Sequence, residues 1–240
     1  MKKVLLLGAS GLIAPHIIPA LEKDYDLRLA DIKDHPDGKP IQTVDVRDYG
    51  QVREAVEGMD AVMNFTVLRH DDTLSFQVNT IGAWNVMKAV ADAGIKKVIH
   101  TGPAQTLLLY AHDTDVPVDA PDAPSSDYYF ITKHLSNEIV RSFARRHEIH
   151  TVCYLFQGLA PRPTEPASKT STRDFLIIYD DLAVACRQGL ELPSVPGFYQ
   201  AFNLHSHYGP GKYSLEKAER ILGYAPQEAW WDWQRRPTED

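Results

Sequence analysis

The sequence predicts an α/β protein built on a doubly wound parallel sheet, and three observations support this prediction. Short apolar and β-branched runs alternate with longer helical patterns through the first hundred residues. The short runs are apolar almost throughout, as expected of strands covered by helices on both faces. A glycine-rich turn separates the first apolar run from the first helical pattern, as in a strand–turn–helix unit of such a sheet.

The elements are expected in a regular order. The first five strands are predicted at residues 3–7, 26–31, 41–44, 60–65 and 97–101, with helices at residues 12–23, 48–57 and 73–93. Gly94 is a typical residue for the end of the third helix. A long loop at residues 102–126 leads to a helix at 127–146 and a strand at 151–156. A second polar loop (161–174) precedes a helix at 180–188, a strand at 201–204 and a helix at 214–222.

Composition excludes several classes of protein. The 240 residues are 44% hydrophobic, which is typical of one globular unit, and the formal net charge of −7 argues against a nucleic-acid partner. The first apolar run stops at Gly8, too early for a secretion signal, and no run is long enough to span a membrane. Cys153 and Cys186 are isolated within apolar runs and are interpreted as buried thiols. We therefore expect a cytoplasmic protein without a membrane partner.

The turn after the first strand has the spacing of a phosphate-binding loop. Small residues at Gly8, Gly11 and Ala14 permit a tight turn, a close approach to a pyrophosphate and close helix–strand packing. Asp31, at the end of the second strand, would accept hydrogen bonds from both ribose hydroxyls and would repel a 2′-phosphate, which favours NAD over NADP. The sheet is therefore predicted to be Rossmann-like. The alternative is an ordinary tight turn followed by a surface aspartate.

A Tyr-x-x-x-Lys pair is the candidate for acid–base chemistry. The chain has three such pairs: Tyr129/Lys133, Tyr208/Lys212 and Tyr213/Lys217. The first alone lies on a helix that leads into a strand of the main sheet, where residues i and i+4 share a face. A nearby ammonium favours the phenolate, so Tyr129 could take a proton from a substrate hydroxyl. The alternative is a packing tyrosine with a solvated lysine.

These motifs together resemble the extended short-chain dehydrogenase/reductase family, of the NAD-dependent epimerase/dehydratase type. The resemblance continues through Asp45-Val46, Asn79 and the segment after the sixth strand, and the tail resembles the uronate dehydrogenase subgroup. It implies catalytic roles for Tyr129, Lys133 and, by proximity, Thr101. It implies that the cofactor contacts Gly8, Ser10, Gly11, Leu12, Ile13, Asp31, Asp45, Val46, Phe65, Thr66, Val67, Asn79, Tyr129, Lys133 and Phe156. It implies that substrate contacts come from His70, Gln105, Gln157, Arg162 and Arg173.

The sequence departs from the family pattern after the fifth strand. The resemblance places a catalytic serine or threonine there, but this chain has Gly102 and Pro103, which carry no hydroxyl. Where small residues are usual after the fourth strand, the chain has Phe65-Thr66-Val67. These departures leave the prediction of cofactor binding intact and make ordinary turnover an open question.

The predicted function is that of an NAD-dependent oxidoreductase, with Tyr129 as acid/base. We divide the chain into an NAD-binding domain (1–160) and a small substrate-binding region (161–240) that is not an independent domain. A region of 80 residues favours a small sugar, polyol or sugar acid. The alternatives are a nucleotide-sugar epimerase or dehydratase, and a catalytically silent NAD-binding regulatory protein. We expect no metal site, and the resemblance implies a homodimer packed through the helices at 73–93 and 127–146.

Overall fold

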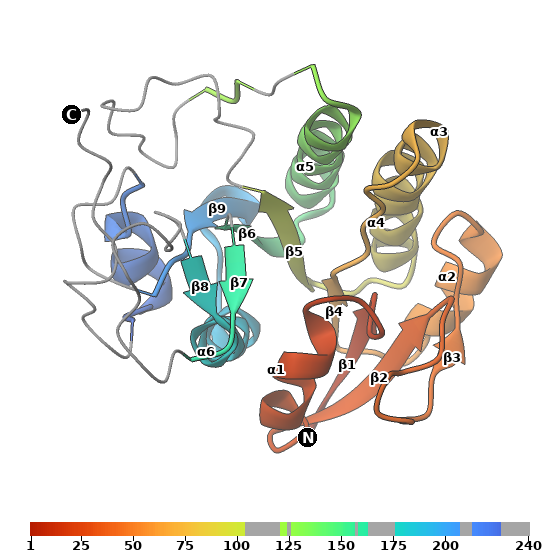
Figure 1. The fold of residues 1–240 in the computed structure, drawn as a ribbon, viewed down its shortest axis with the longest axis horizontal. Helices are drawn as coiled ribbons and strands as arrows, with labels where there is room; N and C mark the ends of the chain where they lie inside the picture. Colours follow the sequence, from red (N-terminus) through yellow and green to blue (C-terminus); the bar gives the residue numbers. More distant parts are fainter. Residues whose placement is uncertain (104–120, 124–125, 157, 163–175, 207–212, 227–240) are drawn as a thin grey trace.

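The computed structural model describes residues 1–103, 121–123, 126–156, 158–162, 176–206 and 213–226. At its centre is a seven-stranded, wholly parallel sheet in the order β3-β2-β1-β4-β5-β6-β9 (Figure 1). Its strands are β1 (Lys2–Leu7), β2 (Tyr25–Asp31), β3 (Gln42–Thr43), β4 (Ala61–Asn64), β5 (Lys97–Pro103), β6 (His150–Phe156) and β9 (Tyr199–Asn203). The predicted Rossmann-like fold class is confirmed.

Helices cover both faces of this sheet (Figure 1). On one face α1 (Ala14–Leu21) packs against α6 (Tyr179–Glu191). On the other, α4 (Gly82–Asp92) lies between α2 (Tyr49–Val56) and α5 (Tyr128–His147). β1 shows why both faces must be covered: Val4 and Leu6 enter one hydrophobic core and Leu5 and Leu7 enter the other. Since alternate residues of a strand point to opposite faces, a continuously apolar run is buried on both sides.

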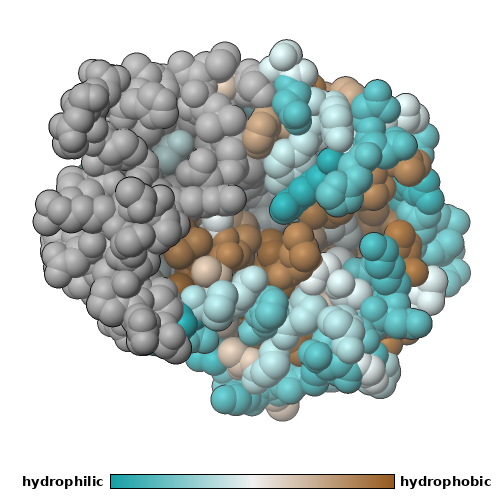
Figure 2. Space-filling model, in the orientation of Figure 1, coloured by the Kyte–Doolittle hydropathy of each residue, from teal (hydrophilic) through white to brown (hydrophobic). Residues whose placement is uncertain are grey.

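The order of the strands positions the candidate site. From β1 the chain proceeds outward through β2 and β3, then returns to place β4, β5 and β6 on the other side of β1. The sheet thus has its switch point between β1 and β4, and ligands of such sheets bind at the carboxyl ends of the strands flanking that point. Figure 2 shows hydrophobic residues gathered in a hollow at the middle of this face of the molecule.

Several elements differ from the predicted ones. The first helix starts at Ala14 instead of residue 12, because the glycine turn extends to Ile13, which is the N-cap. The long helix predicted at 73–93 is three successive segments: α3 (Asp72–Ser75), a π-helical segment η1 (Phe76–Ile81) and α4. β5 extends two residues beyond its predicted end, to Pro103.

The C-terminal region agrees with the prediction in part, since the expected helix at 180–188 is α6 and the expected strand at 201–204 is β9. Residues after 160 contribute α6 and β9 to the main layers, and β9 pairs with β6. A two-stranded parallel sheet, β7 (Gly158–Ala160) with β8 (Leu176–Ile178), was not predicted. The predicted helix at 214–222 is mainly a π-helical segment, η4 (Ala218–Leu222), and a 3-10 turn, η3 (Pro196–Phe198), precedes β9. Within the described ranges, no helix combines the length and apolar character needed to cross a membrane.

Candidate active site

Gly8 joins β1 to the turn at a point where no side chain fits. Its φ is +82°, in the left-handed region, and a Cβ would lie 2.7 Å from the carbonyl carbon of Phe65 and 2.9 Å from the amide nitrogen of Thr66. The Gly8 N–H donates to the Ala30 carbonyl at 2.9 Å. The turn therefore closes tightly over the carboxyl ends of β2 and β4, which is the close backbone approach that a bound pyrophosphate requires.

The turn then directs the start of α1 towards this edge of the sheet. The Gly11 N–H donates to the Gly8 carbonyl at 3.1 Å, and the Ser10 hydroxyl donates to the Lys33 carbonyl at 2.9 Å. Leu12 is 74% exposed, so most of its side chain faces solvent. The N-terminal amides of α1 have no intrahelical partner and can bind an anion. Pro15 lies in this first turn, where a proline costs no helical hydrogen bond.

Asp31 lies where the adenosine ribose of a dinucleotide would be bound. One carboxylate oxygen accepts the Ser10 N–H at 3.0 Å and the other accepts the Lys33 N–H at 3.1 Å. These two bonds orient the carboxylate and leave lone pairs for ribose hydroxyls. The cradle at Gly8, the start of α1 and this carboxylate therefore fit NAD.

Replacing Asp31 with serine should weaken NAD binding about tenfold and narrow the preference for NAD over NADP. The reason is that serine removes the acceptors for the ribose hydroxyls and the charge that repels a 2′-phosphate. Titration of both cofactors by calorimetry measures the change. A variant that retains the wild-type ratio of NAD to NADP affinity would show that Asp31 does not contact the ribose.

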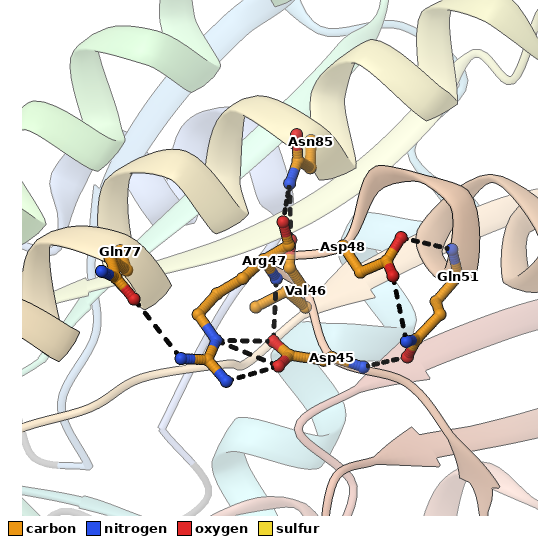
Figure 3. A network of polar contacts seen from close by, with 7 residues as sticks. All are labelled: Asp45, Val46, Arg47, Asp48, Gln51, Gln77 and Asn85. Atoms are coloured by element: carbon orange, nitrogen blue, oxygen red, sulfur yellow. Dashed lines mark hydrogen bonds and ion pairs between the residues drawn. The ribbon is translucent and has the colours of Figure 1, made fainter.

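A polar network surrounds Asp45 and Val46, two of the predicted cofactor contacts (Figure 3). The Asp45 carboxylate accepts three bonds from the Arg47 guanidinium, between 2.6 and 3.0 Å, and this pairing lowers the pKa of Asp45. The Asn85 amide donates to the Val46 and Arg47 carbonyls at 2.9 and 3.0 Å. Arg47 also reaches Gln77 of η1 at 3.3 Å. The network holds residues 45–47 in one conformation, with the Asp45 carboxylate already ion-paired.

The Asn79 side chain connects two segments of the protein by hydrogen bonds. Its side-chain oxygen accepts the Leu68 N–H at 2.9 Å, and its amide nitrogen donates to the Leu68 carbonyl at 3.0 Å and to the Thr132 hydroxyl at 2.9 Å. The Thr132 hydroxyl in turn donates to the Tyr129 carbonyl at 3.0 Å. Asn79, carried by the π-helical segment, therefore aligns the loop after β4 with the first turn of α5. These bonds support a positioning role more directly than the predicted cofactor contact.

Tyr129 and Lys133 lie one turn apart at the N-terminal end of α5, which Asp127 caps through the Tyr129 N–H at 2.8 Å. Burial raises the pKa of Tyr129, and the nearby Arg69 guanidinium opposes that rise. Lys133 is almost fully buried, and burial lowers the pKa of its ammonium to about 8. The site thus holds a phenol and a poorly solvated amine on one helix face.

Replacing Lys133 with methionine should stabilise the apo protein by about 2 kcal/mol at pH 7 while abolishing activity, because it removes a buried charge. The folded-state pKa of Lys133 is depressed, so between about pH 8 and the unfolded value near pH 10.4 the unfolded state binds more protons. The wild type therefore gains stability through that window and the variant does not. Urea unfolding at pH 7 and pH 10 measures this, and an equal difference at both pH values would contradict it.

Strand alternation decides which residues of β5 face α5. His100 bonds Ser136 of α5 at 3.1 Å, and a Cβ on Gly102 would lie 2.7 Å from the Asn137 amide nitrogen. Thr101, between them, points to the opposite face, on the side of α6. The catalytic role of Thr101, predicted from its proximity to the missing hydroxyl, stays a prediction; strand pairing continues through this residue, and its neighbours His100 and Gly102 face α5.

The other predicted residues are distributed along the same edge. Phe65 and Phe156 are buried at the ends of β4 and β6, and Thr66 and Val67 are half-buried in the loop after β4. His70 is exposed, and Arg162 is ion-paired with Asp180 at 3.3 Å. Gln105, Gln157 and Arg173 lie outside the described residues.

Arg69 is the residue that sequence reasoning missed. Its guanidinium carbon lies 5.2 Å from the centre of the Tyr129 ring. The sequence signal for Arg69 is its position directly before the predicted His70, in the loop after β4. This loop lies at the edge of the sheet where ligands bind.

A separate cluster has the residue types of a metal site. Asp122, His134 and Glu138 offer ligand atoms within 4.8 Å of one another. They line a cavity of about 530 Å³ beside α5 and β9, together with Arg141 and other polar side chains. His134 pairs with Asp122 at 2.9 Å and Arg141 pairs closely with Glu138. These pairings account for the cluster without an ion.

A doubly wound sheet with this turn at its switch point defines a Rossmann-type dinucleotide-binding protein. Comparison with known proteins narrows the class. The chain belongs to the NAD dependent epimerase/dehydratase family, whose sequence model matches residues 4–175. The predicted family and NAD as cofactor are thereby confirmed, and the chain is an NAD-dependent oxidoreductase of the epimerase/dehydratase type.

Individual relatives span nearly the whole chain. Uronate dehydrogenase of Pseudomonas putida is 27% identical over 236 residues, covering 95% of this chain and 84% of that protein. NAD-dependent glucose-6-phosphate dehydrogenase of Haloferax volcanii is 23% identical, covering 94% and 93%. The crystal structure of uronate dehydrogenase from Agrobacterium tumefaciens superposes with a TM-score of 0.83 at 18% identity, covering 96% of this chain and 86% of that chain. The structural likeness supports the fold.

Proposed function

We propose that the protein is a dehydrogenase that oxidises a hydroxyl of a small sugar, polyol or sugar acid, with Tyr129 as the acid/base. The observation that carries this proposal is the Tyr129–Lys133 pair on the first turns of α5, in a chain whose glycine turn fits NAD. Similarity to uronate dehydrogenase along 95% of the chain favours sugar acids within this group.

Each group in the site has a defined task. NAD, when bound, supplies the hydride acceptor. The proposed task of the Tyr129 phenolate is to take the hydroxyl proton of the substrate, and that of the Lys133 ammonium, one turn further along α5, is to favour the phenolate. Asn79 keeps the turn of Tyr129 aligned with the loop after β4 through Thr132. Backbone groups at residues 8–13 and the Asp31 carboxylate hold the nucleotide.

A substrate screen tests the proposal. Purified protein with NAD is offered uronic acids, aldoses, sugar phosphates and polyols, and NADH formation is followed by absorbance, with NAD binding measured in parallel by calorimetry. We expect turnover with uronic acids at kcat/KM above about 10⁴ M⁻¹s⁻¹. NAD binding without turnover of any compound would overturn the dehydrogenase proposal. Interconversion of nucleotide sugars without net NADH formation would indicate an epimerase.

One observation favours a second candidate, a silent NAD-binding protein. The Asn137 and Leu155 side chains occupy the space that a side chain at position 102 would need. The hydroxyl that the resemblance places at Pro103 or Gly102 is absent from the sequence, and a side chain at 102 would require the ends of the Asn137 and Leu155 side chains to move. The same screen separates the two candidates.

We also propose that the protein forms a homodimer through α4 and α5. Four large hydrophobic side chains are exposed on this helix pair and the adjoining η1 segment: Phe76, Ile81, Trp84 and Leu135. Trp84 is half exposed, and its ring packs edge-on against Phe143 of α5, with 4.9 Å between ring centroids. A cluster of exposed aromatic and aliphatic side chains is typical of a subunit interface.

Replacing Trp84 with aspartate should convert the dimer to a monomer. The free energy needed to bury an unpaired carboxylate at the interface exceeds the free energy of association that the exposed hydrophobic side chains provide. Sedimentation equilibrium measures the mass, and the circular dichroism spectrum should remain that of the wild type. A wild-type mass equal to one chain, or an unchanged mass in the variant, would contradict this interface.

A further inference from the structure

The site needs a hydrogen-bond donor that β5 does not provide. Gly102 is directed towards α5, where a Cβ would lie 2.7 Å from the Asn137 amide nitrogen and 2.9 Å from Leu155 Cδ2. A serine there would have to displace two side chains of the packed interior. While Tyr129 takes a proton, negative charge develops on the substrate oxygen, and a donor directed at that oxygen lowers the barrier.

Arg69 is placed to be that donor. Its guanidinium lies over the Tyr129 ring, 5.2 Å from the ring centre. Its backbone is fixed on both sides, since the Tyr128 hydroxyl donates to the Arg69 carbonyl at 2.9 Å and Asn79 holds both polar backbone groups of Leu68. The residue belongs to a short loop at the carboxyl end of β4, beside the predicted cofactor contacts.

The charge of Arg69 acts on Tyr129 through a side-chain hydrogen bond as well as through space. The residue is exposed, and no carboxylate in the described part of the chain forms an ion pair with it. Its positive charge lowers the pKa of Tyr129 against the effect of burial, and also lowers the pKa of Lys133. The guanidinium therefore acts on both members of the catalytic pair.

We propose that Arg69 is a catalytic residue: it donates a hydrogen bond to the oxygen of the hydroxyl being oxidised, in place of the serine or threonine absent after β5. This inference rests on the proposed dehydrogenase function. Arg69 holds the substrate oxygen while the proton of that oxygen moves to Tyr129, and it retains its own proton throughout. Its rigid, planar fork suits a fixed donor beside an aromatic ring.

Kinetics of three variants test the inference. Arg69→Gln should lower kcat/KM about 100-fold and move the acidic limb of its pH profile to higher pH, because the positive charge that favours the phenolate is lost. Arg69→Lys should recover about tenfold of that loss and return the limb towards the wild-type pH, since it restores the charge without the fork. Arg53→Gln, which removes a distant exposed guanidinium from α2, is the matched control and should behave as wild type.

A direct titration of Tyr129 separates this inference from the proposed function. Apo protein carrying fluorotyrosine, whose phenol ionises at lower pH, is followed by ¹⁹F NMR, and Tyr129→Phe identifies the resonance. Arg69→Gln should raise the titration midpoint of Tyr129 by about half a pH unit or more. NAD affinity should stay within about twofold of wild type, because Arg69 does not belong to the nucleotide contacts.

The outcomes are distinct. A shifted midpoint with a 100-fold loss of kcat/KM supports Arg69 as the donor. An unshifted midpoint, or a fully active Arg69→Gln variant, overturns the inference even if the wild type proves to be a dehydrogenase. A wild type that binds NAD but oxidises no compound overturns the proposed function and the catalytic role of Arg69 with it, while a shifted midpoint would still establish the electrostatic contact.

Discussion

Tyr129→Phe should lower kcat by a factor of about 10²–10⁴ and leave the Kd for NAD nearly unchanged. Phenylalanine preserves the ring that Arg69 contacts and removes only the hydroxyl that exchanges the proton. The first turn of α5 is also preserved, because Asp127 caps it through the Tyr129 backbone. Steady-state kinetics with the best substrate of the screen, together with calorimetric titration of NAD, provide the two readouts.

A matched control for this variant is available on α2. The Tyr49 hydroxyl donates a hydrogen bond to Asp92 at the surface of the protein. Neither residue belongs to the predicted site. Tyr49→Phe removes one phenol hydroxyl of the same kind and should retain wild-type kcat. Equal activities for both variants would eliminate Tyr129 as the acid/base, and a parallel loss of NAD affinity would indicate a binding role instead.

Gly8→Ala should destabilise the protein by about 3 kcal/mol and abolish detectable NAD binding. The positive φ costs about 1–2 kcal/mol for a residue with a Cβ, and contact with the backbone of Phe65 and Thr66 adds about 1–3 kcal/mol. Those contacts are backbone atoms, which cannot rotate away as a side chain can. Relief by separating β1 from β4 would open the turn that fits the pyrophosphate. Urea unfolding and calorimetry measure the two effects.

Gly58→Ala separates the two contributions. Gly58 also has a positive φ, +74°, but a Cβ there would meet nothing within 4 Å. This variant should lose only the conformational part, about 1 kcal/mol, and bind NAD as the wild type does. Similar losses of stability in both variants would mean that the steric contact between position 8 and the residues after β4 does not contribute to the destabilisation.

The residues predicted for the nucleotide end of the site lie together in the structure because their sequence signals are local. Gly8, Gly11 and Asp31 occur at spacings set by one strand, one turn and the next strand, so their positions follow from the βαβ geometry. The Tyr129–Lys133 pair was recognised for the same reason, since four residues on a helix fix a shared face.

The other residues of the candidate site are positioned by tertiary packing, which the spacing of residues along the sequence does not reveal. Thr101 is predicted only from its place along the chain, and the alternation of β5 puts it on the opposite face from His100 and Gly102. Asn79 was predicted from resemblance, whereas its bonds to Leu68 and Thr132 exist only because η1 and α5 pack together. Arg69 reaches Tyr129 through a loop whose conformation those same bonds determine.

The packing around Gly102 also limits how this site could change over evolutionary time. A serine at position 102 requires the ends of the Asn137 and Leu155 side chains to move, and both of these side chains can rotate. A smaller residue at 137 beside an unchanged Gly102 leaves a void instead. The two positions are therefore coupled, and the energetic cost of a serine at 102 depends on the residue at 137.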